Sequence, residues 1–296
     1  TIEGLSAYVK SCEPDMIVIH GDRVEALAGA IVGSLNNILV AHIEGGEVSG
    51  TIDELIRHST SKMSHVHFVS NKQAKKRLIQ MGELENQVFV IGSPDIDVMF
   101  SNNLPSLQQV KDYYKISFDN YSVVLFHPVT TEQFRLQQDS EVFVSSMLED
   151  TGNYVVIYPN NDMGTSTILT AYEALKGNPR FKIFPSLRFE YFLRLLKNSD
   201  FMIGNSSAGI REAPYYGIPS INLGSRQKNR AFGETIIHAD FDKTSIKESI
   251  AIARNMGKCD PKFDFGNGNS SEQFFKIISS PEFWESAHQK QFNDLN

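Results

Sequence analysis

Short apolar runs alternate with helix-period segments along almost the whole chain, and this alternation limits the possible fold more than any other feature. Met16–His20 is followed by a helical pattern from about Val24 to Leu35, and Ile38–Ile43 is followed by one from about Asp53 to Met63. Apolar strands that alternate with helices are typical of parallel βαβ units. The sequence therefore predicts an α/β protein with parallel sheets.

The alternation is interrupted between Asp97 and Asn120, where polar residues and Pro105 replace the regular pattern. The chain of 296 residues also exceeds the size at which one hydrophobic core usually stops growing. We therefore expect two doubly wound halves with a cleft between them. Further strands are predicted at Val66–Ser70, Val88–Gly92, Ser122–Phe126, Tyr154–Tyr158, Phe181–Phe184, Phe201–Ile203, Ser220–Leu223 and Thr235–His238.

Two successive strands end in ionisable side chains. The first predicted strand leads into Asp22, and the second leads into Glu44 and a glycine-rich turn that reaches Asp53. A carboxylate at the end of a buried strand is unfavourable unless it is paired or faces a cleft. Neighbouring carboxylates drive their pKa values apart, which supplies both an acid and a base, so these three are predicted to handle protons. Taken alone, Asp53 fits a helix N-cap, and Asp22 fits an ion pair with Arg23.

Candidate anion ligands follow strands in the second half of the chain. His127 comes directly after a strand and can hydrogen-bond a phosphate or carry a proton. Ser206 and Ser207 precede a helical pattern, where free N–H groups and hydroxyls bind anions, although serine is also a common helix cap. Glu212 has the reach to hold a sugar diol, as acidic residues do in nucleotide-binding α/β folds. Arg226 adds a cation just beyond the next strand.

Several classes of function do not fit the composition. The formal charge of −7 and the pI near 5.6 argue against nucleic-acid and anionic-membrane partners. Cys12 and Cys259 lie far apart in sequence, which suits a reducing cytoplasm. His65 and His67 have no third ligand nearby in sequence, and no GxGxxG motif follows a strand. We therefore expect neither a metal nor a nicotinamide cofactor. Lys75-Lys76-Arg77 is expected to form a solvated helix face.

A long series of motifs runs in order from about Asp15 to about Ile278. It consists of His20-Gly21-Asp22-Arg23, residues 42–54 (HIEGGEVSGTIDE) with Ile56-Arg57-His58, His127-Pro128-Val129-Thr130-Thr131, Pro159-Asn160, Gly204-Asn205-Ser206-Ser207 with Arg211-Glu212, residues 222–227 (NLGSRQ) and Gly266-Asn267-Gly268-Asn269. Taken together, the series resembles the hydrolysing UDP-N-acetylglucosamine 2-epimerases of sialic acid biosynthesis. The complete series is far more specific than any one of its motifs.

The resemblance implies a GT-B-like architecture, with two Rossmann-like domains around a cleft. We expect an N-terminal domain over residues 1–110, a C-terminal UDP-binding domain over residues 111–270, and a C-terminal helix over residues 271–296 that packs back toward the first domain. The implied reaction converts UDP-N-acetylglucosamine and water to N-acetylmannosamine and UDP without a cofactor, by anti elimination to a 2-acetamidoglucal and then hydration. Such an enzyme is expected in the cytoplasm as a homodimer or higher homo-oligomer.

The resemblance also implies roles for individual residues. The catalytic residues of the family match Asp22, Glu44, Asp53 and His127. The residue that removes the C2 proton is not assigned. The UDP contacts match Arg23, Phe184, Ser206, Ser207, Glu212 and Arg226, with the backbone of Phe184 facing uracil. Asn160 and Asp162 fall near the sugar.

One part of the family pattern has no counterpart in this chain. The first strand of the family and the turn after it carry an Arg and a Ser for the diphosphate, whereas this chain begins at Thr1 in a segment typical of a helix end. We therefore expect that an N-terminal segment is missing. If it is absent from the molecule, the first sheet lacks a central strand; if only this chain is trimmed, nothing else changes.

Alternative functions stay open at this point. Non-hydrolysing epimerases typically carry a Glu-Ala-Gly turn where this chain has Glu44-Gly45-Gly46, and this difference favours hydrolysis. A hydrolysing epimerase for a UDP-2,4-diacetamido sugar has the same motifs. From other classes, a GT-B glycosyltransferase and a UDP-sugar-binding protein are the alternatives, although three grouped carboxylates would be superfluous in a transferase.

Overall fold

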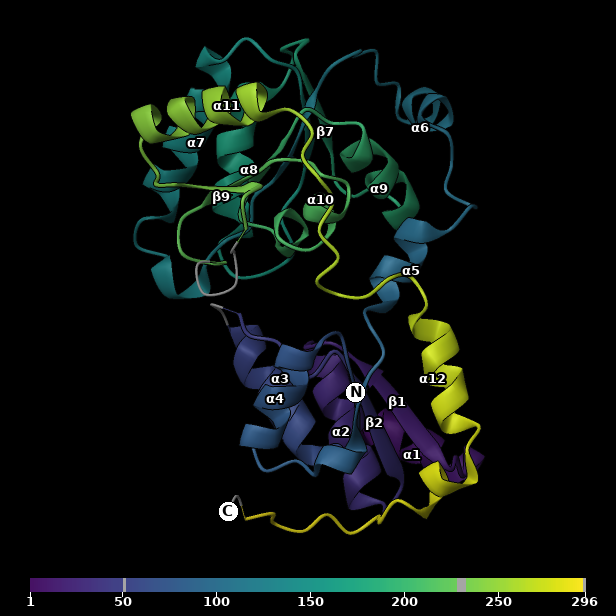
Figure 1. The fold of residues 1–296 in the computed structure, drawn as a ribbon. Coiled ribbons are helices and arrows are strands. Elements are labelled where there is room, and N and C mark those ends of the chain that lie inside the picture. Colours follow the sequence, from purple (N-terminus) through teal and green to yellow (C-terminus); the bar gives the residue numbers. More distant parts are fainter. Residues whose placement is uncertain (50–51, 228–232, 295–296) are drawn as a thin grey trace. The chain divides into compact units, whose positions relative to one another are not determined.

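The computed structural model describes residues 1–49, 52–227 and 233–294. They form two compact units, one of Thr1–Ser101 with the segment from Asp264 onward, and one of Asn102–Phe263 (Figure 1). Each unit is built on its own parallel sheet. The predicted α/β class with two parallel sheets is confirmed.

Unit 1 contains a four-stranded parallel sheet whose strands follow one another in chain order. The strands are β1 (Met16–His20), β2 (Leu39–Ile43), β3 (Val66–Val69) and β4 (Val88–Val90). Among the described residues this sheet shows no reversal of strand order, because each crossover adds the next strand on the same side. The helices of the unit are α1 (Ile2–Cys12), α2 (Val24–Leu35), α3 (Ile52–Met63), α4 (Lys72–Gln80), α5 (Pro94–Phe100) and α12 (Ser270–Ile278).

The C-terminal segment completes the hydrophobic core of unit 1. Phe68 on β3 is fully buried, and its ring lies 4.6 Å from that of Phe274 on α12. Phe283, from the 3₁₀ turn Pro281–Glu285, packs in the same cluster. Figure 1 shows α12 in yellow beside the purple strands of this unit. The segment after Asp264 is therefore a structural part of unit 1 although it lies far away in sequence.

Unit 2 contains a six-stranded parallel sheet in the order β10-β9-β8-β5-β6-β7. This order is doubly wound, because it reverses between the adjacent strands β5 and β8. The strands are β5 (Ser122–Leu125), β6 (Tyr154–Ile157), β7 (Phe181–Phe184), β8 (Met202–Gly204), β9 (Ser220–Leu223) and β10 (Ile236–Ala239). The helices are α6 (Leu107–Tyr114), α7 (Leu136–Glu149), α8 (Thr165–Tyr172), α9 (Phe189–Lys197), α10 (Glu212–Tyr215) and α11 (Lys243–Met256).

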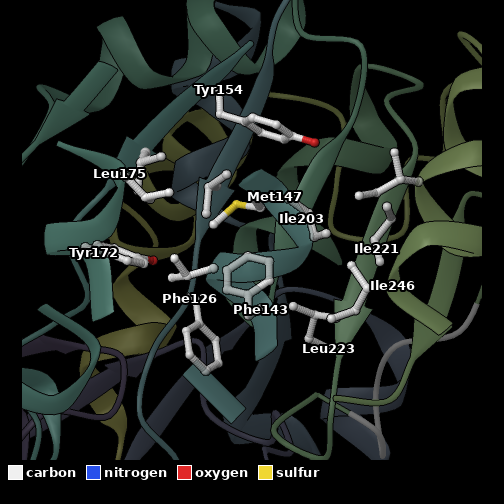
Figure 2. Close-up of a cluster of buried hydrophobic side chains, with 14 of the residues drawn as sticks. Phe126, Phe143, Met147, Tyr154, Tyr172, Leu175, Ile203, Ile221, Leu223 and Ile246 are labelled. Atoms are coloured by element: carbon white, nitrogen blue, oxygen red, sulfur yellow. The ribbon is translucent and has the colours of Figure 1, made fainter. Parts of the chain in front are cut away.

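The main core of unit 2 lies between this sheet and the helices α7, α8 and α11 (Figure 2). Phe126 follows β5 and packs edge to face on Phe143 of α7, with ring centroids 5.4 Å apart. Met147, Tyr172 and Ile246 are buried in the same cluster. Val124, Val156 and Ile203 of the strands face this core, and the neighbouring strand residues are also buried, although outside this cluster.

The boundary between the units differs from the expected one at residue 110. It lies after Ser101, because Arg194 of α9 donates a hydrogen bond from Nε to the carbonyl of Pro105 at 2.6 Å and so holds the segment before α6 on unit 2. The second boundary lies before Asp264 rather than after residue 270, since the Ser93 amide donates to the Phe265 carbonyl at 2.7 Å. Within the described ranges, no helix is both long and apolar enough to cross a membrane.

Candidate active site

Glu44, at the carboxyl end of β2, is held in an unusual backbone conformation. Its φ angle is 64°, in the left-handed region that a residue with a side chain seldom adopts and that is often found at functional sites. Its amide donates to the Phe68 carbonyl at 2.8 Å. Its side chain is only 7% exposed, and Oε2 lies 3.1 Å from Nε2 of His20, which ends β1. The carboxylate at this strand end is therefore paired, as its burial requires.

Asp22 pairs with an arginine from α3. The Arg57 guanidinium is buried, forms an ion pair with the Asp22 carboxylate and donates from Nη1 to the Glu47 carbonyl at 3.1 Å. Arg23 instead forms an ion pair with Asp53 at 3.8 Å, so the ion pair between Asp22 and its sequence neighbour is not the one observed. Asp53 and Arg57 lie four residues apart on α3 and so share one helix face.

His42 links the turn after β1 to α3. Its Nε2 lies 2.8 Å from the Gly21 carbonyl, and its Nδ1 lies 2.9 Å from Oγ of Ser61. Burial lowers the pKa of His42 to about 3, although the bond to Gly21 opposes this change. The neutral ring therefore donates from Nε2 to the carbonyl and accepts the Ser61 hydroxyl at Nδ1. This fully buried residue fixes the turn that presents Asp22, and it was not predicted as a site residue.

The Glu44-Gly45-Gly46 turn is packed against its supporting helices. A Cβ atom at Gly45 would lie 2.8 Å from Oγ of Ser61 and 2.9 Å from Nδ1 of His42, closer than real contacts allow. Arg77 of α4 donates to the Gly46 carbonyl at 3.2 Å, so the expectation that this arginine belongs to a purely solvated face is wrong. Gly50 and Thr51, which continue the turn, lie outside the described residues.

In unit 2, the reversal of strand order places the ends of β5 and β8 side by side. Gly204 has a φ angle of 146°, and a Cβ atom there would lie 2.0 Å from the Leu125 carbonyl oxygen. Next to it, the Asn205 side chain accepts from the His127 amide at 2.7 Å and donates to the His127 carbonyl at 2.8 Å. Ligands of doubly wound sheets bind at such a reversal. Asn205 joins the two strand ends there and was missed as a site residue.

His127 has a defined ring orientation. Its Nδ1 accepts a hydrogen bond from the Asn160 amide at 3.1 Å, so a neutral ring carries its proton on Nε2. Arg226 and Gln227 both donate to the Asn205 carbonyl, from Nη1 at 3.1 Å and from Nε2 at 3.0 Å. The predicted residues His127, Asn160 and Arg226 are thus brought together around Asn205.

The serine segment differs from the expected helix N-terminus. Oγ of Ser206 accepts from the Ala208 amide at 3.3 Å, which is the capping role considered as its alternative. Ser207 begins a 3₁₀ turn, Ser207–Gly209, and Glu212 begins the four-residue helix α10. Pro214 keeps this segment from forming a long helix directly after the strand. An anion here would meet amide groups and hydroxyls without the dipole of a long helix.

Phe184, Asn160 and Asp162 lie at or just after the ends of strands β6 and β7, which are on the side of β5 away from β8. Phe184 ends β7, where its carbonyl accepts from the Tyr158 amide at 2.9 Å and its ring lies 5.1 Å from that of Tyr114. Asn160 donates from its side chain to the Asp162 carboxylate. Both residues follow β6, so these predicted side chains also lie at the carboxyl edge of the unit 2 sheet.

Residues 1–279 match the profile of the protein family described as UDP-N-acetylglucosamine 2-epimerase. The chain belongs to this family. A UDP-N-acetylglucosamine 2-epimerase of Neisseria meningitidis serogroup B is 51% identical, over 100% of this chain and 79% of its own length. A hydrolysing UDP-N,N'-diacetylbacillosamine 2-epimerase of Legionella pneumophila is 32% identical, over 94% of this chain and 74% of its own length. The polysialic acid biosynthesis protein P7 of Escherichia coli is 36% identical, over 88% and 66%.

A solved structure matches the fold of this 2-epimerase family member. The Methanocaldococcus jannaschii UDP-GlcNAc 2-epimerase, in complex with UDP-GlcNAc and UDP, superposes with a TM-score of 0.78 at 24% identity, over 94% of this chain and 79% of that one. The expected GT-B-like fold of the 2-epimerase is therefore confirmed.

The candidate site contains more supporting residues than the sequence indicated. His42, Arg57, Arg77 and Asn205 each position a predicted residue or its turn, by hydrogen bonds that join segments distant in sequence. Across the described parts of the chain, no three His, Cys, Asp or Glu side chains are grouped as metal ligands would be.

Proposed function

We propose that this protein is a hydrolysing 2-epimerase that converts UDP-N-acetylglucosamine and water to N-acetylmannosamine and UDP. The observation that carries the proposal is the set of three carboxylates at one edge of the unit 1 sheet, Asp22, Glu44 and Asp53, each in contact with a basic side chain. A protein that only binds a nucleotide sugar does not need three carboxylates in this arrangement. The family and the names of its relatives agree with this chemistry.

The first step of the proposed reaction is an elimination. No carbonyl acidifies the C2 proton, so cleavage of the C1–O bond runs ahead and gives C1 oxocarbenium character, which nearby carboxylates stabilise. The electron pair of that bond leaves with UDP, and a carboxylate takes the C2 proton. The product is a 2-acetamidoglucal. This step needs one ionised carboxylate and a pocket that stabilises the departing diphosphate.

The second step is a hydration with the opposite stereochemistry at C2. A carboxylic acid protonates C2 from the other face, water adds to C1, and the proton of that water passes to a carboxylate. The sequence of bond changes releases N-acetylmannosamine and needs no cofactor. Carboxylates in different protonation states fit these tasks, since neighbouring acids titrate apart.

UDP is proposed to lie at the carboxyl edge of the unit 2 sheet. A neutral His127 ring offers its Nε2 proton to a diphosphate oxygen, and the Arg226 guanidinium supplies the positive charge. Ser206, Ser207 and Glu212 are proposed to hold the phosphate and ribose, the backbone of Phe184 the uracil, and Asn160 with Asp162 the sugar. Arg23, from unit 1, is proposed as a further diphosphate contact.

Hydrolysis rather than simple epimerisation is favoured by the Glu44-Gly45-Gly46 turn. An alanine at position 45, as in the turn typical of non-hydrolysing enzymes, would press on Ser61 and on His42. The second glycine is equally constrained, because a Cβ atom at Gly46 would lie 2.3 Å from the Ala74 carbonyl oxygen. The Glu-Gly-Gly sequence is thus part of the packing that presents Glu44.

The test is incubation of the full chain with UDP-N-acetylglucosamine in D2O. We expect release of UDP and of N-acetylmannosamine that carries deuterium at C2. Intact UDP-N-acetylmannosamine as the final product would contradict the hydrolytic assignment, and binding without product would contradict an enzymatic one. A parallel incubation with a UDP-2,4-diacetamido sugar tests the substrate of the Legionella pneumophila relative. Light scattering tests the proposed self-association into a homodimer or higher oligomer.

A further inference from the structure

The three carboxylates at the edge of the unit 1 sheet contact bases of two different kinds. Asp22 contacts Arg57, and Asp53 contacts Arg23. Glu44 contacts His20, with 3.1 Å between Oε2 and Nε2. A guanidinium group stays protonated in proteins, whereas an imidazole gains and loses a proton near neutral pH. Of these three described pairs, the pair of Glu44 and His20 is the one in which the base can accept and pass on a proton.

His20 also connects a buried carboxylate with solvent. The side chain of Glu44 is 7% exposed, whereas that of His20 is 45% exposed. His20 is the last residue of β1, and its register partner on β2 is Ile43, the residue before Glu44. The sheet therefore fixes the imidazole beside the carboxylate while part of the ring faces water.

The proposed reaction requires such a connection. In one turnover, the base on one face of the sugar gains the C2 proton, and the acid on the other face loses the proton that it gives to C2. Both groups must return to their starting states before the next substrate reacts, and solvent is the source and the sink of those protons. We propose that His20 is a relay residue that exchanges the proton of Glu44 with solvent, an inference that rests on the proposed hydrolytic epimerisation.

The transfer is balanced in both directions. To discharge Glu44, the O–H bond of its carboxylic acid breaks and an N–H bond forms at Nε2 of His20, which leaves a carboxylate and an imidazolium ion. The imidazolium then loses its Nδ1 proton to water. To load Glu44, water protonates Nδ1 and Nε2 gives its proton to the carboxylate. Other charged or titratable groups that the structure describes around this edge include Asp22, Arg23, His42, Glu47, Asp53, Arg57 and Arg77.

The test is the His20→Gln substitution in the full chain. The glutamine amide can still donate a hydrogen bond to Glu44, but it cannot carry a proton. We expect kcat for UDP release to fall about 100-fold with KM changed less than about threefold. We also expect added imidazole to restore part of kcat and the solvent deuterium isotope effect on kcat to increase. The control is His288→Gln, which replaces an exposed histidine of unit 1 whose Nδ1 lies 2.7 Å from the Asn37 carbonyl. It should leave kcat unchanged.

Two results would overturn the relay: a His20→Gln variant with the kcat of the unchanged protein, or a loss of kcat that imidazole does not restore. If the unchanged protein gives no N-acetylmannosamine, the proposed function fails instead. The pairing is then still tested by nitrogen NMR of the His20 ring. The Nε2 resonance should move when Glu44 is replaced in Glu44→Gln, and an unmoved resonance would contradict the pairing.

Discussion

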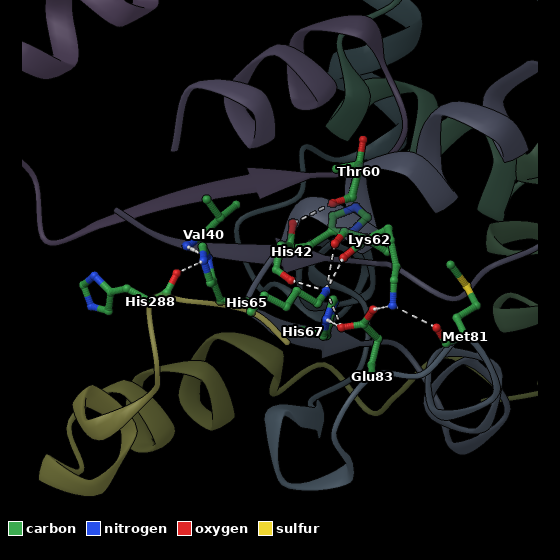
Figure 3. Close-up of polar contacts among 12 residues, drawn as sticks. Val40, His42, Thr60, Lys62, His65, His67, Met81, Glu83 and His288 are labelled. Carbon is green, nitrogen blue, oxygen red and sulfur yellow. Dashed lines mark hydrogen bonds and ion pairs between the residues drawn. The ribbon is translucent and has the colours of Figure 1, made fainter. Parts of the chain in front are cut away.

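Besides the pair of His58 and Glu54 within α3, unit 1 joins histidine and glutamate across segments distant in sequence at two described places, and these two pairs differ in exposure and in their third partners. His67 Nε2 lies 2.9 Å from Glu83, with side chains 0% and 2% exposed, and Lys290 Nζ lies 2.5 Å from the same carboxylate (Figure 3). The pair of His20 and Glu44 lies 3.1 Å apart, with the histidine 45% exposed. The pair of His67 and Glu83 thus lies in a closed network, whereas the pair of His20 and Glu44 lies at the solvent boundary.

The buried pair has fixed charges. Burial alone would raise the pKa of Glu83, but hydrogen bonds from His67 and Lys290 lower it to about 2. Burial lowers the pKa of His67, so its neutral ring donates to an ionised carboxylate. Lys290 also donates to the Lys62 and Ser64 carbonyls, at 2.9 and 2.7 Å, and so fastens the C-terminal segment beside α3. The comparison indicates that a third, permanently charged partner makes such a pair structural.

The largest expected effect concerns turnover at the exposed edge. Asp22→Asn, Glu44→Gln and Asp53→Asn should each lower kcat by about 1,000-fold, because each removes a group that carries a proton or stabilises charge in the proposed reaction. UDP affinity, measured by calorimetry, should change less than about threefold, since UDP is proposed to lie on unit 2. A loss of UDP affinity of similar size in all three variants would make these carboxylates structural.

The next effect concerns stability at the buried pair. Glu83→Gln removes the buried carboxylate that pairs with His67 and with the partly exposed Lys290, and it should lower the free energy of unfolding by about 3 kcal/mol in urea titrations. The control is Glu85→Gln, since Glu85 is 75% exposed and its ion pair with Lys75 spans 3.7 Å. That change should stay within about 0.5 kcal/mol. Equal losses in both variants would remove the distinction between the two kinds of pair.

A smaller effect is expected where an arginine holds one of the proposed catalytic carboxylates. Arg57→Lys keeps the positive charge but cannot contact Asp22 and the Glu47 carbonyl with a planar fork. We expect kcat to fall about tenfold, with KM changed less. The control is Arg254→Lys in the ion pair with Asp150 in unit 2, which should leave kcat unchanged. An unaffected Arg57→Lys enzyme would show that charge alone suffices at this position.

The sequence made the strands and the carboxylates predictable but not their partners. All ten observed strands, β1 to β10, were expected, because apolar runs between helical patterns reflect the burial of both faces of a parallel sheet. Glu44 and Asp22 were found because a carboxylate at a strand end has no packing role. The choice between Arg23 and Arg57 depends on the approach of α3, and the contact of Glu83 with Lys290 depends on the return of the C-terminal segment. Neither arrangement leaves a local pattern in the sequence.

The buried histidines and Glu83 lose stability over different pH ranges as acid is added. Burial lowers the pKa of His42 from 6.5 to about 3, and burial also lowers those of His65 and His67. Between these values the unfolded chain binds more protons than the folded one, so stability falls as the pH falls from about 6.5 toward 3. Glu83 adds a loss only as the pH falls from about 4.5 toward 2. Urea midpoints measured from pH 7 to pH 5.5 should therefore decrease.

The matched variant for this pH dependence is His42→Gln, which keeps a donor for the Gly21 carbonyl but has no group that titrates. Its stability should change with pH less than that of the unchanged protein, by about 1 kcal/mol across the same interval. His20→Gln should instead change the pH profile of kcat, because it removes the group proposed to exchange protons with solvent. A flattened stability profile in His20→Gln together with an unchanged one in His42→Gln would instead assign the pH dependence of stability to the exposed histidine.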